Sequence, residues 1–300
     1  MAAPDLPRFE DLEGVRRRVA ERLDAVDRVL VVMSGKGGVG KSTVAVNLAV
    51  GLARGGARVG ILDADLHGPS VAKMLGLRGE PLRVAVGAGR GEPELLRPVP
   101  GPVGLRVQSM DFFLQGNQAL DWDGEAGEGA SLRSALEQAA LADLLGLTDW
   151  GELDWLVVDL APGSDRLPAL AGWLPAASAA LAVTIPTEVA MLAVERSLRR
   201  ARALRFPVLG IVENFASSVC GRCGAEAPLW REASAEALAD ATALPVVARV
   251  PFDARLARDA DAGRVFLDGE GIASPAGRAL LALADTVAAW RGPDPEGDAW

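Results

Sequence analysis

The stretch Gly35-Lys-Gly-Gly-Val-Gly-Lys41-Ser-Thr43 decides the fold of this chain. It satisfies the pattern G-x-x-x-x-G-K-[ST], in which glycines let successive backbone N–H groups point at phosphate oxygens. The apolar run 29–33 predicts a strand just before this loop, and the apolar spacing of 41–54, ended by Gly55-Gly56, predicts a helix just after it. Because that helix adds the positive end of its dipole, we expect the loop to bind a phosphate-bearing ligand.

The residues of this loop have distinct expected tasks. Lys41 would reach the β- and γ-phosphates of a nucleotide, and Ser42 would ligate Mg²⁺. The expected nucleotide-binding residues are Gly35, Lys36, Gly37, Gly38, Val39, Gly40, Lys41, Ser42 and Thr43. A guanine-specific Asn-Lys-x-Asp motif is excluded, because none of the three lysines of the chain follows an asparagine. Adenine is therefore the expected base, and ATP with Mg²⁺ the expected ligand.

Further apolar runs continue the alternation of strand and helix. They lie at 59–63, 105–109, 155–159, 180–185, 208–212 and 246–250. Because these runs are continuously hydrophobic rather than alternating, they predict a parallel sheet that helices cover on both faces. The expected fold class is α/β, a doubly wound and mostly parallel sheet. Residues 76–104, rich in Gly, Pro and Arg, and residues 115–130, acidic and glycine-bearing, predict loops, the first with an edge hairpin.

Three carboxylates stand at or just after predicted strand ends. In a doubly wound sheet ligands bind at the carboxyl ends of the strands, so Asp63, Asp65 and Asp159 are expected to converge on the phosphate loop. Asp159 is expected to hold a Mg²⁺-bound water, and Asp65 to orient the water that attacks the γ-phosphate in line. An aspartate at a strand end can also be only a helix cap or a turn residue, and that alternative stays open for both residues.

The composition excludes several classes of protein. The chain has 300 residues, of which 50% are hydrophobic and 24% charged, and this excludes disorder as its dominant state. The net charge of −9 argues against nucleic-acid binding through a broad basic surface, and the arginine-rich run 196–205 is interpreted as a solvated helix face. The start of the chain shows no secretory signal, so a cytoplasmic, reducing compartment is expected.

No contact with a membrane is expected either. Residues 167–187 carry no charge, but they contain three prolines and predict a short helix followed by a buried strand. Residues 276–291 predict a packing helix rather than a basic amphipathic anchor. We expect an N-terminal extension with a surface helix at 1–28, one ATPase domain at 29–291 that includes the two cysteines, and a flexible acidic tail at 292–300.

The chain has two cysteines, Cys220 and Cys223, and one histidine, His67. A C-x-x-C pair alone is compatible with a redox disulfide, half a zinc site or half an iron–sulfur site. The glycines between and after the cysteines are more typical of a metal-binding turn than of the helix start that lowers the pKa of redox cysteines. Two thiolates per chain complete a four-sulfur set only across a two-fold axis, so a metal centre here would imply a dimer.

The phosphate loop resembles the deviant Walker A motif of the ParA/MinD-type ATPases, in which an early second lysine reaches the nucleotide of the other subunit. Lys36 matches that lysine, which accounts for two lysines in the loop of an arginine-biased chain. Asp63-Ala-Asp65-Leu-His-Gly-Pro-Ser70 resembles the switch I segment, and Asp159-Leu-Ala-Pro-Gly163 resembles the Walker B and switch II segment. The resemblance implies that Lys36 and Lys41 neutralise charge on the phosphates, with Asp65 in the water-activating position.

Within this superfamily the chain resembles the Mrp/ApbC branch of iron–sulfur cluster carrier ATPases. The resemblance covers residues 29–290 and rests on the Asp-Ala-Asp-x-x-Gly-Pro-Ser form, on Trp150-Gly-Glu-Leu-Asp-Trp155 and on the segment from Val212 to the cysteine pair. It implies an ATP-dependent homodimer, a bridging [4Fe–4S] cluster held by Cys220 and Cys223 of each subunit, a cluster-assembly scaffold as donor and apo-proteins as acceptors. It also implies that Asn214 lies near adenine, with Pro251 as a weaker candidate.

Departures from the family pattern affect the switch segments. Residues 159–165 are one residue shorter than the family form, and Trp122-Asp-Gly-Glu125 replaces an arginine-bearing segment, so slow turnover is expected. His67 stands where the family more often has tyrosine, and is interpreted as a switch residue rather than a metal ligand. Two alternatives remain: a nucleotide-switched positioning ATPase that binds DNA or membrane, and a diverged ATP-binding member with weak hydrolysis and Zn²⁺ on the cysteines.

Overall fold

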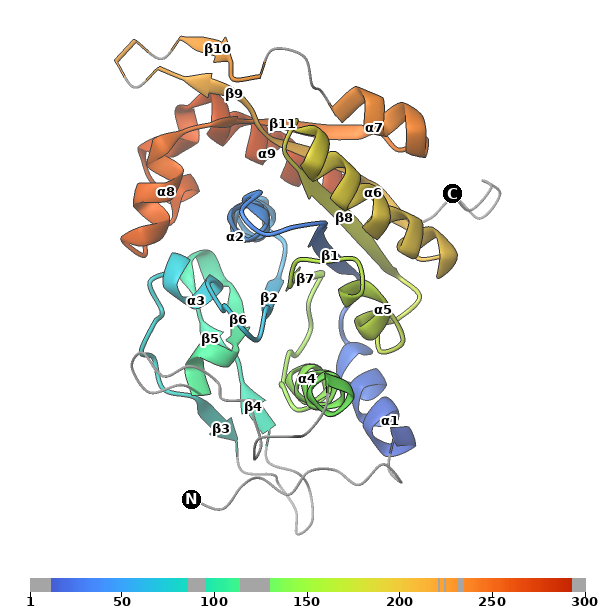
Figure 1. Ribbon diagram of the computed structural model, residues 1–300. Helices are drawn as coiled ribbons and strands as arrows, with labels where there is room; N and C mark the ends of the chain where they lie inside the picture. The colour runs from blue at the N-terminus through green and yellow to red at the C-terminus, as the bar shows by residue number, and fades with distance from the viewer. Residues whose placement is uncertain are drawn as a thin grey trace.

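The computed structural model describes residues 12–85, 95–113, 130–220, 222–223, 225–230 and 235–292. Within this part, nine strands form one sheet (Figure 1). These strands are β1 (Val29–Ser34), β2 (Val59–Ala64), β5 (Val99–Pro100), β6 (Arg106–Ser109), β7 (Trp155–Leu160), β8 (Ser178–Thr184), β9 (Val208–Val219), β10 (Glu226–Pro228) and β11 (Val246–Phe252).

The sheet is parallel except at its two ends. Its order is β10-β9-β8-β1-β7-β2-β6-β5, and β11 also pairs with β9 in parallel. Only β10 and β5 run antiparallel to their neighbours in this sheet. A separate antiparallel pair consists of β3 (Arg83–Ala85) and β4 (Leu95–Arg97). The carboxyl ends of β1, β2 and β7 therefore meet at one edge of the sheet, where polar side chains can converge.

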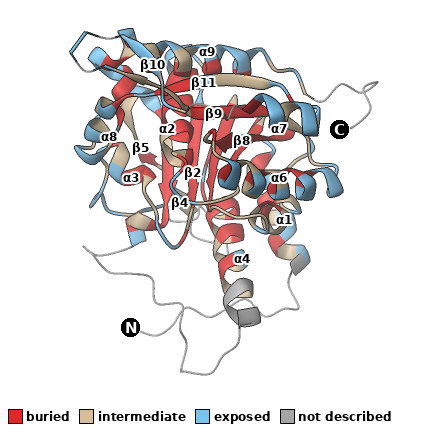
Figure 2. Ribbon diagram, turned by 45° about the horizontal axis from the view of Figure 1, so that its top comes forward, coloured by how far each residue is buried: buried red, intermediate tan, exposed pale blue. Residues whose placement is uncertain are grey.

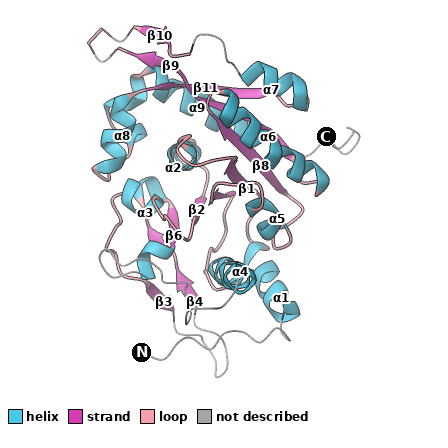
Figure 3. Ribbon diagram, in the orientation of Figure 1, coloured by secondary structure: helices cyan, strands magenta, loops and turns pink. Residues whose placement is uncertain are grey.

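Helices cover both faces of the sheet (Figure 3). They are α1 (Leu12–Leu23), α2 (Lys41–Arg54), α3 (Val71–Met74), α4 (Ala130–Gly146), α5 (Arg166–Ala171), α6 (Glu188–Ala203), α7 (Ala235–Thr242), α8 (Ala254–Asp261) and α9 (Pro275–Ala289), with short 3₁₀ turns η2 (Pro102–Gly104), η3 (Met110–Phe113), η4 (Phe266–Asp268) and η5 (Glu270–Ala273). The hydrophobic core on one face includes residues of α2, α3, α8 and α9. The core on the other face includes residues of α1, α4, α5, α6 and α7.

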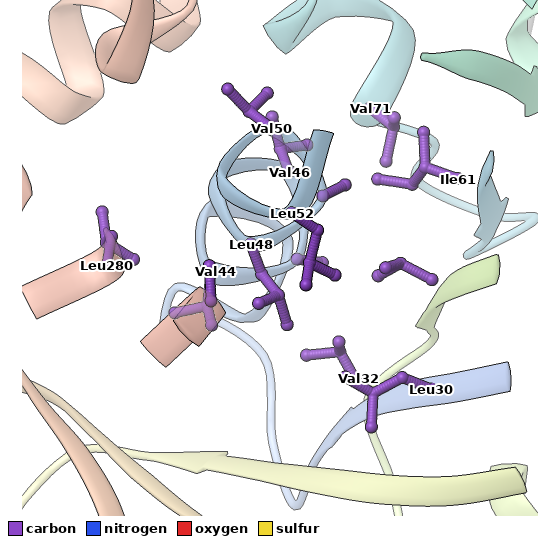
Figure 4. Packing of buried hydrophobic residues seen from close by; sticks show 14 of the residues in the cluster. Leu30, Val32, Val44, Val46, Leu48, Val50, Leu52, Ile61, Val71 and Leu280 are labelled. Atoms are coloured by element: carbon purple, nitrogen blue, oxygen red, sulfur yellow. The ribbon is translucent and has the colours of Figure 1, made fainter. Parts of the chain in front are cut away.

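The central strands are buried on both faces, as their unbroken apolar sequence predicts. Every residue of β1, β2, β7 and β8 is buried (Figure 2). Helix α2 lies between the sheet and α9, with Leu30 and Val32 of β1 on one side of it and Leu280 of α9 on another (Figure 4). This packing fixes the start of α2 against the end of β1, where the phosphate loop must turn.

The structure confirms the predicted fold class and corrects two details. The helix expected before the first strand is present as α1, and its buried stripe, which includes Val19 and Leu23, packs against α4, because its apolar residues recur every four positions. The hairpin predicted within 76–104 exists as β3 and β4 but does not join the main sheet. Strand β9 extends seven residues beyond the predicted 208–212, up to Val219. Most of the loop predicted at 115–130 lies outside the described residues.

The uncharged stretch 167–187 is part of the globular core. It contains most of α5 and all of β8, as predicted from its prolines. The predicted C-terminal packing helix is α9, in which Leu280, Leu283 and Val287 are buried. Among the described helices, none combines the length and apolar content that crossing a bilayer requires.

Candidate functional site

The loop between β1 and α2 has an open side and a packed side. Gly38 and Gly40 both have a φ of 80°, a left-handed conformation that favours glycine, and Gly40 caps α2 without a side-chain hydrogen bond. A Cβ atom at Gly37 or Gly38 would meet nothing within 4 Å, whereas a Cβ at Gly35 would lie 2.1 Å from the carbonyl carbon of Ala193 in α6. The loop therefore rests on α6, and its other side leaves room for a ligand at the uncapped start of α2.

Lys41 and Asp159 form a buried ion pair at the floor of this loop. Lys41 Nζ also lies 3.3 Å from the hydroxyl of Ser42. Burial raises the pKa of Asp159, while the ammonium group of Lys41 and the hydroxyl of Ser42 oppose that shift. The structure thus brings Lys41 and Ser42 together with Asp159, although Lys41 and Asp159 are 118 residues apart in the sequence.

The oxygens near Lys41 suit a hydrated Mg²⁺ ion. Asp159 Oδ2 is buried and has no hydrogen-bond partner among the described residues, so it can accept a hydrogen bond from a metal-bound water. The Ser42 hydroxyl is a second hard oxygen on the same side. Ser42 and Thr43 both belong to the first turn of α2, as the motif predicts. The residues present therefore fit the expected metal and nucleotide.

Lys36 differs from Lys41 in its surroundings. Its side chain is half-buried, its carbonyl accepts a hydrogen bond from the hydroxyl of Ser34 at 3.1 Å, and it forms no ion pair with any described residue. With no ion-pair partner among the described residues, the ammonium group of Lys36 can bind an anionic group that does not belong to this chain.

Asp63 and Asp65 have different roles in the loop that follows β2. Asp63 is fully buried, and its Oδ2 accepts hydrogen bonds from the backbone N–H groups of Ser70 at 2.8 Å and Val71 at 3.0 Å. Burial and the neighbouring Asp159 raise the pKa of Asp63 to about 7. Asp65 is half-buried, and its Oδ1 accepts only a local bond, from Gly68 N–H at 3.1 Å. Asp63 therefore folds the loop, and Asp65 is the more accessible carboxylate.

His67 is held by a residue that the sequence did not single out. Its Nε2 lies 2.7 Å from Oε1 of Glu137, on α4, and Oε2 of Glu137 accepts a hydrogen bond from Arg166 at the start of α5. These three residues line a cavity of about 470 Å³ that extends to Gly35. A glutamate within an ordinary helical pattern carries no sequence signal for such a position, because its partners are 70 and 29 residues away.

Asn214 contacts the phosphate loop directly. Its side chain is buried, and its Nδ2 donates a hydrogen bond to the carbonyl of Val39 at 2.8 Å. A Cβ atom at Gly40 would lie 2.1 Å from the same Nδ2, so only glycine fits there. In this structure Asn214 braces the loop, and its contact with adenine stays a prediction.

Cys220 and Cys223 lie in the turn between β9 and β10, at the far end of the strand that carries Asn214 (Figure 1). Both side chains are exposed, and the N–H of Cys220 donates to the carbonyl of Ala225 at 2.8 Å. Backbone N–H groups of Cys223 and Arg222 point at the Cys220 sulfur and lower the pKa of its thiol. Among the described residues, no group of three or more His, Cys, Asp or Glu side chains is arranged to hold a metal.

Comparison with known proteins gives consistent results. Residues 25–288 match the family described as ParA, NUBPL iron-transfer P-loop NTPase. The chain is 35% identical over 280 residues to the iron–sulfur cluster carrier protein of Saccharolobus solfataricus, covering 93% of this chain and 88% of the relative. It is 38% identical over 276 residues to the iron–sulfur cluster carrier protein of Deinococcus radiodurans, covering 91% of this chain and 73% of the relative.

Solved structures show the same fold. A nucleotide-binding protein of Archaeoglobus fulgidus, in complex with ADP, matches with a TM-score of 0.69 and 34% identity over 85% of this chain and 94% of that chain. The MinD cell division protein of Aquifex aeolicus matches with a TM-score of 0.57 and 19% identity, over 89% of this chain and 98% of that chain. At this level of identity, the similarity to the MinD protein shows a shared fold and nothing more.

Proposed function

Because this chain belongs to the NUBPL iron-transfer P-loop NTPases of the ParA family, we propose that it binds and hydrolyses ATP to carry iron–sulfur clusters. The observation that carries the proposal is the course of β9. Asn214 in this strand holds the carbonyl of Val39 in the phosphate loop, and Cys220 follows the last residue of the same strand. One strand therefore connects the nucleotide loop to the two thiols.

The cysteine turn supports a shared cluster as cargo. A lowered pKa favours the thiolate of Cys220, which is the form that binds iron, and both sulfurs are exposed to a donor or an acceptor. The chain has two cysteines in all, so four thiolates for a [4Fe–4S] cluster require two chains. We propose that Cys220 and Cys223 of a homodimer hold the cluster between them, and that it passes from an assembly scaffold to apo-proteins.

The residues around the phosphate loop can support hydrolysis. Lys41 would leave Asp159 to contact the β- and γ-phosphates, and Lys36 would add a second positive charge from the partner chain. Asp65 would accept a hydrogen bond from the attacking water and orient it. Mg²⁺, when bound through Ser42 and a water held by Asp159, supplies charge neutralisation on the phosphate oxygens. We expect slow intrinsic turnover, in the reducing cytoplasm where the thiols stay free.

Anaerobic reconstitution tests the cluster. Wild-type protein treated with iron and sulfide should bind about two iron atoms per chain, with visible absorbance, as one four-iron cluster per dimer requires. Cys220→Ser and Cys223→Ser should each lose it, while Ser217→Ala, in the same hairpin, should retain it. Iron retained by the double cysteine variant, or zinc alone in the purified wild-type protein, would overturn the proposal.

A turnover assay tests the nucleotide half separately. Lys41→Ala should abolish ATP binding, whereas Lys36→Ala should retain binding and lose most of the hydrolysis, because Lys36 has no described partner within its own chain. In sedimentation experiments the wild-type protein should form a dimer when ATP is added, and Lys36→Ala should not. Equal turnover and equal dimerisation of Lys36→Ala would contradict the role given to this lysine.

The positioning-ATPase alternative has weaker structural support. Its candidate surface is the arginine-rich end of α6, where Arg199 pairs with Glu195 at 2.7 Å and Arg200 lies 3.9 Å from Asp165. Part of the positive charge is thus neutralised within the chain. ATP-dependent co-sedimentation with DNA or with anionic vesicles would revive this alternative.

A further inference from the structure

One carboxylate connects the two segments that face the phosphate loop. Glu137 projects from α4, and 10% of its side chain is exposed. Its Oε1 contacts Nε2 of His67, in the loop after β2, at 2.7 Å. Its Oε2 accepts a hydrogen bond from Nη1 of Arg166, the first residue of α5. Helix α4 therefore holds both segments through the single side chain of Glu137.

These two segments adjoin the carboxylates proposed for catalysis, since the first begins with Asp65 and the second follows β7, the strand that carries Asp159. His67 lies two residues beyond Asp65, and Arg166 lies seven residues beyond Asp159. The second segment has further attachments, because the N–H of Gly163 donates to the carbonyl of Ser34 at 3.0 Å and Asp165 lies 3.9 Å from Arg200. The 470 Å³ cavity beside Gly35 is bounded by both segments and by Glu137. Glu137 thus joins the two segments on the side of the cavity that α4 forms.

Because Glu137 is largely buried, its carboxylate depends on the two contacts with His67 and Arg166. Burial by itself would raise the pKa of Glu137, but hydrogen bonds from Arg166 and His67 outweigh it and place the pKa below its ordinary value. Glu137 is therefore ionised, and a buried carboxylate is stable only while it is paired and hydrogen-bonded. Asp165 and Arg196 also line the cavity, but no hydrogen bond joins them to Glu137. Among the described residues, Arg166 and His67 each contact one of its two carboxylate oxygens.

We propose that Glu137 is a positioning residue for ATP hydrolysis. It acts through His67 and Arg166, and it holds the segment that begins at Asp65 against the segment that follows β7, the strand of Asp159. The helix it projects from packs against α1 and also contacts α5, and the hydrogen bonds of Glu137 go to His67 and Arg166 rather than to the phosphate loop. The proposal rests on the proposed ATPase function.

Hydrogen–deuterium exchange of the nucleotide-free protein tests the placement directly. Glu137→Ala should accelerate exchange at least about tenfold in both 65–70 and 161–167, since it removes two hydrogen bonds that involve charged groups. His67→Ala should accelerate only the first segment, and Arg166→Ala only the second. Exchange in α2 should stay unchanged in all three variants. Acceleration throughout the chain, or none in the two segments, would overturn the proposal.

A matched control lies on the same helix. Asp143 of α4 pairs with Arg18 of α1 at 2.8 Å, so Asp143→Ala breaks an ion pair of α4 that does not involve the two segments. It should leave exchange in 65–70 and 161–167 at wild-type rates. If Asp143→Ala accelerates those segments as much as Glu137→Ala does, Glu137 acts only through the stability of α4 and the proposal fails.

Turnover distinguishes a positioning role from a structural one. Glu137→Ala should lower kcat about tenfold while changing KM for ATP less than about twofold, because the phosphate loop is intact. Glu137→Gln, which can still accept from Arg166, should recover part of kcat. An unchanged kcat with accelerated exchange would refute the positioning role. A wild-type protein without ATPase activity would refute the proposed function, while the exchange experiment would still decide whether Glu137 holds both segments.

Discussion

The contact between the phosphate loop and α6 yields a prediction with a built-in control. Gly35 and Gly37 belong to the same loop, and neither has a left-handed backbone, so alanine differs from glycine at these positions only by its Cβ atom. At Gly35 that atom would lie 2.1 Å from the carbonyl carbon of Ala193 and 2.2 Å from the N atom of Val194. At Gly37 it would meet nothing within 4 Å.

The two substitutions should therefore differ strongly in stability. Both atoms near Gly35 are backbone atoms of a packed helix, which cannot move away as a flexible side chain would. Overpacking of this kind costs about 1–3 kcal/mol, and we expect the upper end of that range for Gly35→Ala. For a domain of this size a loss near 3 kcal/mol lowers Tm by roughly 5 °C. Gly37→Ala should change the free energy of unfolding by less than about 1 kcal/mol.

For ATP binding by the folded protein we expect the opposite ranking, with the larger loss in Gly37→Ala than in Gly35→Ala. Gly37→Ala places a methyl group on the open side of the loop, where we expect the phosphates, and should weaken ATP binding at least about tenfold. Thermal unfolding of both variants, with titration of a fluorescent ATP analogue below Tm, measures the two effects separately. Wild-type ATP affinity in Gly37→Ala would refute the assignment of the open side to the phosphates, and wild-type stability in Gly35→Ala would refute the packing argument.

The remaining predictions concern three further side chains. Lys41→Ala leaves the buried carboxylate of Asp159 without its partner and should cost about 3 kcal/mol of stability by urea unfolding, most of which Asp159→Asn should restore in the double variant. Asn214→Ala removes the bond to Val39 and should weaken ATP binding about fivefold to tenfold. In the wild-type protein we expect ATP to change the rate at which Cys220 and Cys223 are alkylated, and the variant at saturating ATP should lose this effect. An ATP effect that persists in the variant would count against β9 as the connection. For Asp63, whose pKa of about 7 lies above the ordinary 3.8, the folded state binds a proton between these values. Stability should therefore fall by about 1 kcal/mol per pH unit as pH rises from 4 to 7, and Asp63→Asn should flatten this slope in urea titrations; an equally steep slope in the variant would exclude Asp63 as its source.

The parts of the fold that are local in sequence could be predicted, and those that depend on long-range contacts could not. The loop from Gly35 to Thr43, the helix after it and the buried strands follow from glycine content and hydrophobic runs within a few residues. The convergence of Asp63 and Asp159 also followed, because neighbouring parallel strands end at one edge, and the two residues are in register. The sequence could therefore place the glycine-rich loop and these two carboxylates at the same edge of the sheet.

The contacts made by Asn214 and Glu137 could not be predicted from sequence patterns, for a physical reason. Asn214 reaches Val39 across 175 residues, and Glu137 reaches His67 across 70. A single asparagine or glutamate has no periodicity that would distinguish a contact residue from a solvated one. The length of β9 was underestimated for a related reason, since residues 213–219 are mixed polar and apolar and pair with β10 and β11.

That extra length determines how nucleotide could affect the cysteines. Asn214 and Cys220 are six residues apart, which in a straight strand would be roughly 20 Å, so we expect an effect of nucleotide on the thiols to pass through the strand. Between them Phe215 has a φ of 54°, and the register with β11 shifts, with Asn214 opposite Val250 but Ser218 opposite Phe252. A bulge of this kind bends a strand locally and changes the direction in which it continues. Trp230 fixes the bend by donating from Nε1 to the carbonyl of Phe215 at 2.7 Å. A shift of the loop that pulls on Asn214 should therefore tilt the outer hairpin about Phe215 as a unit and move the two sulfurs together.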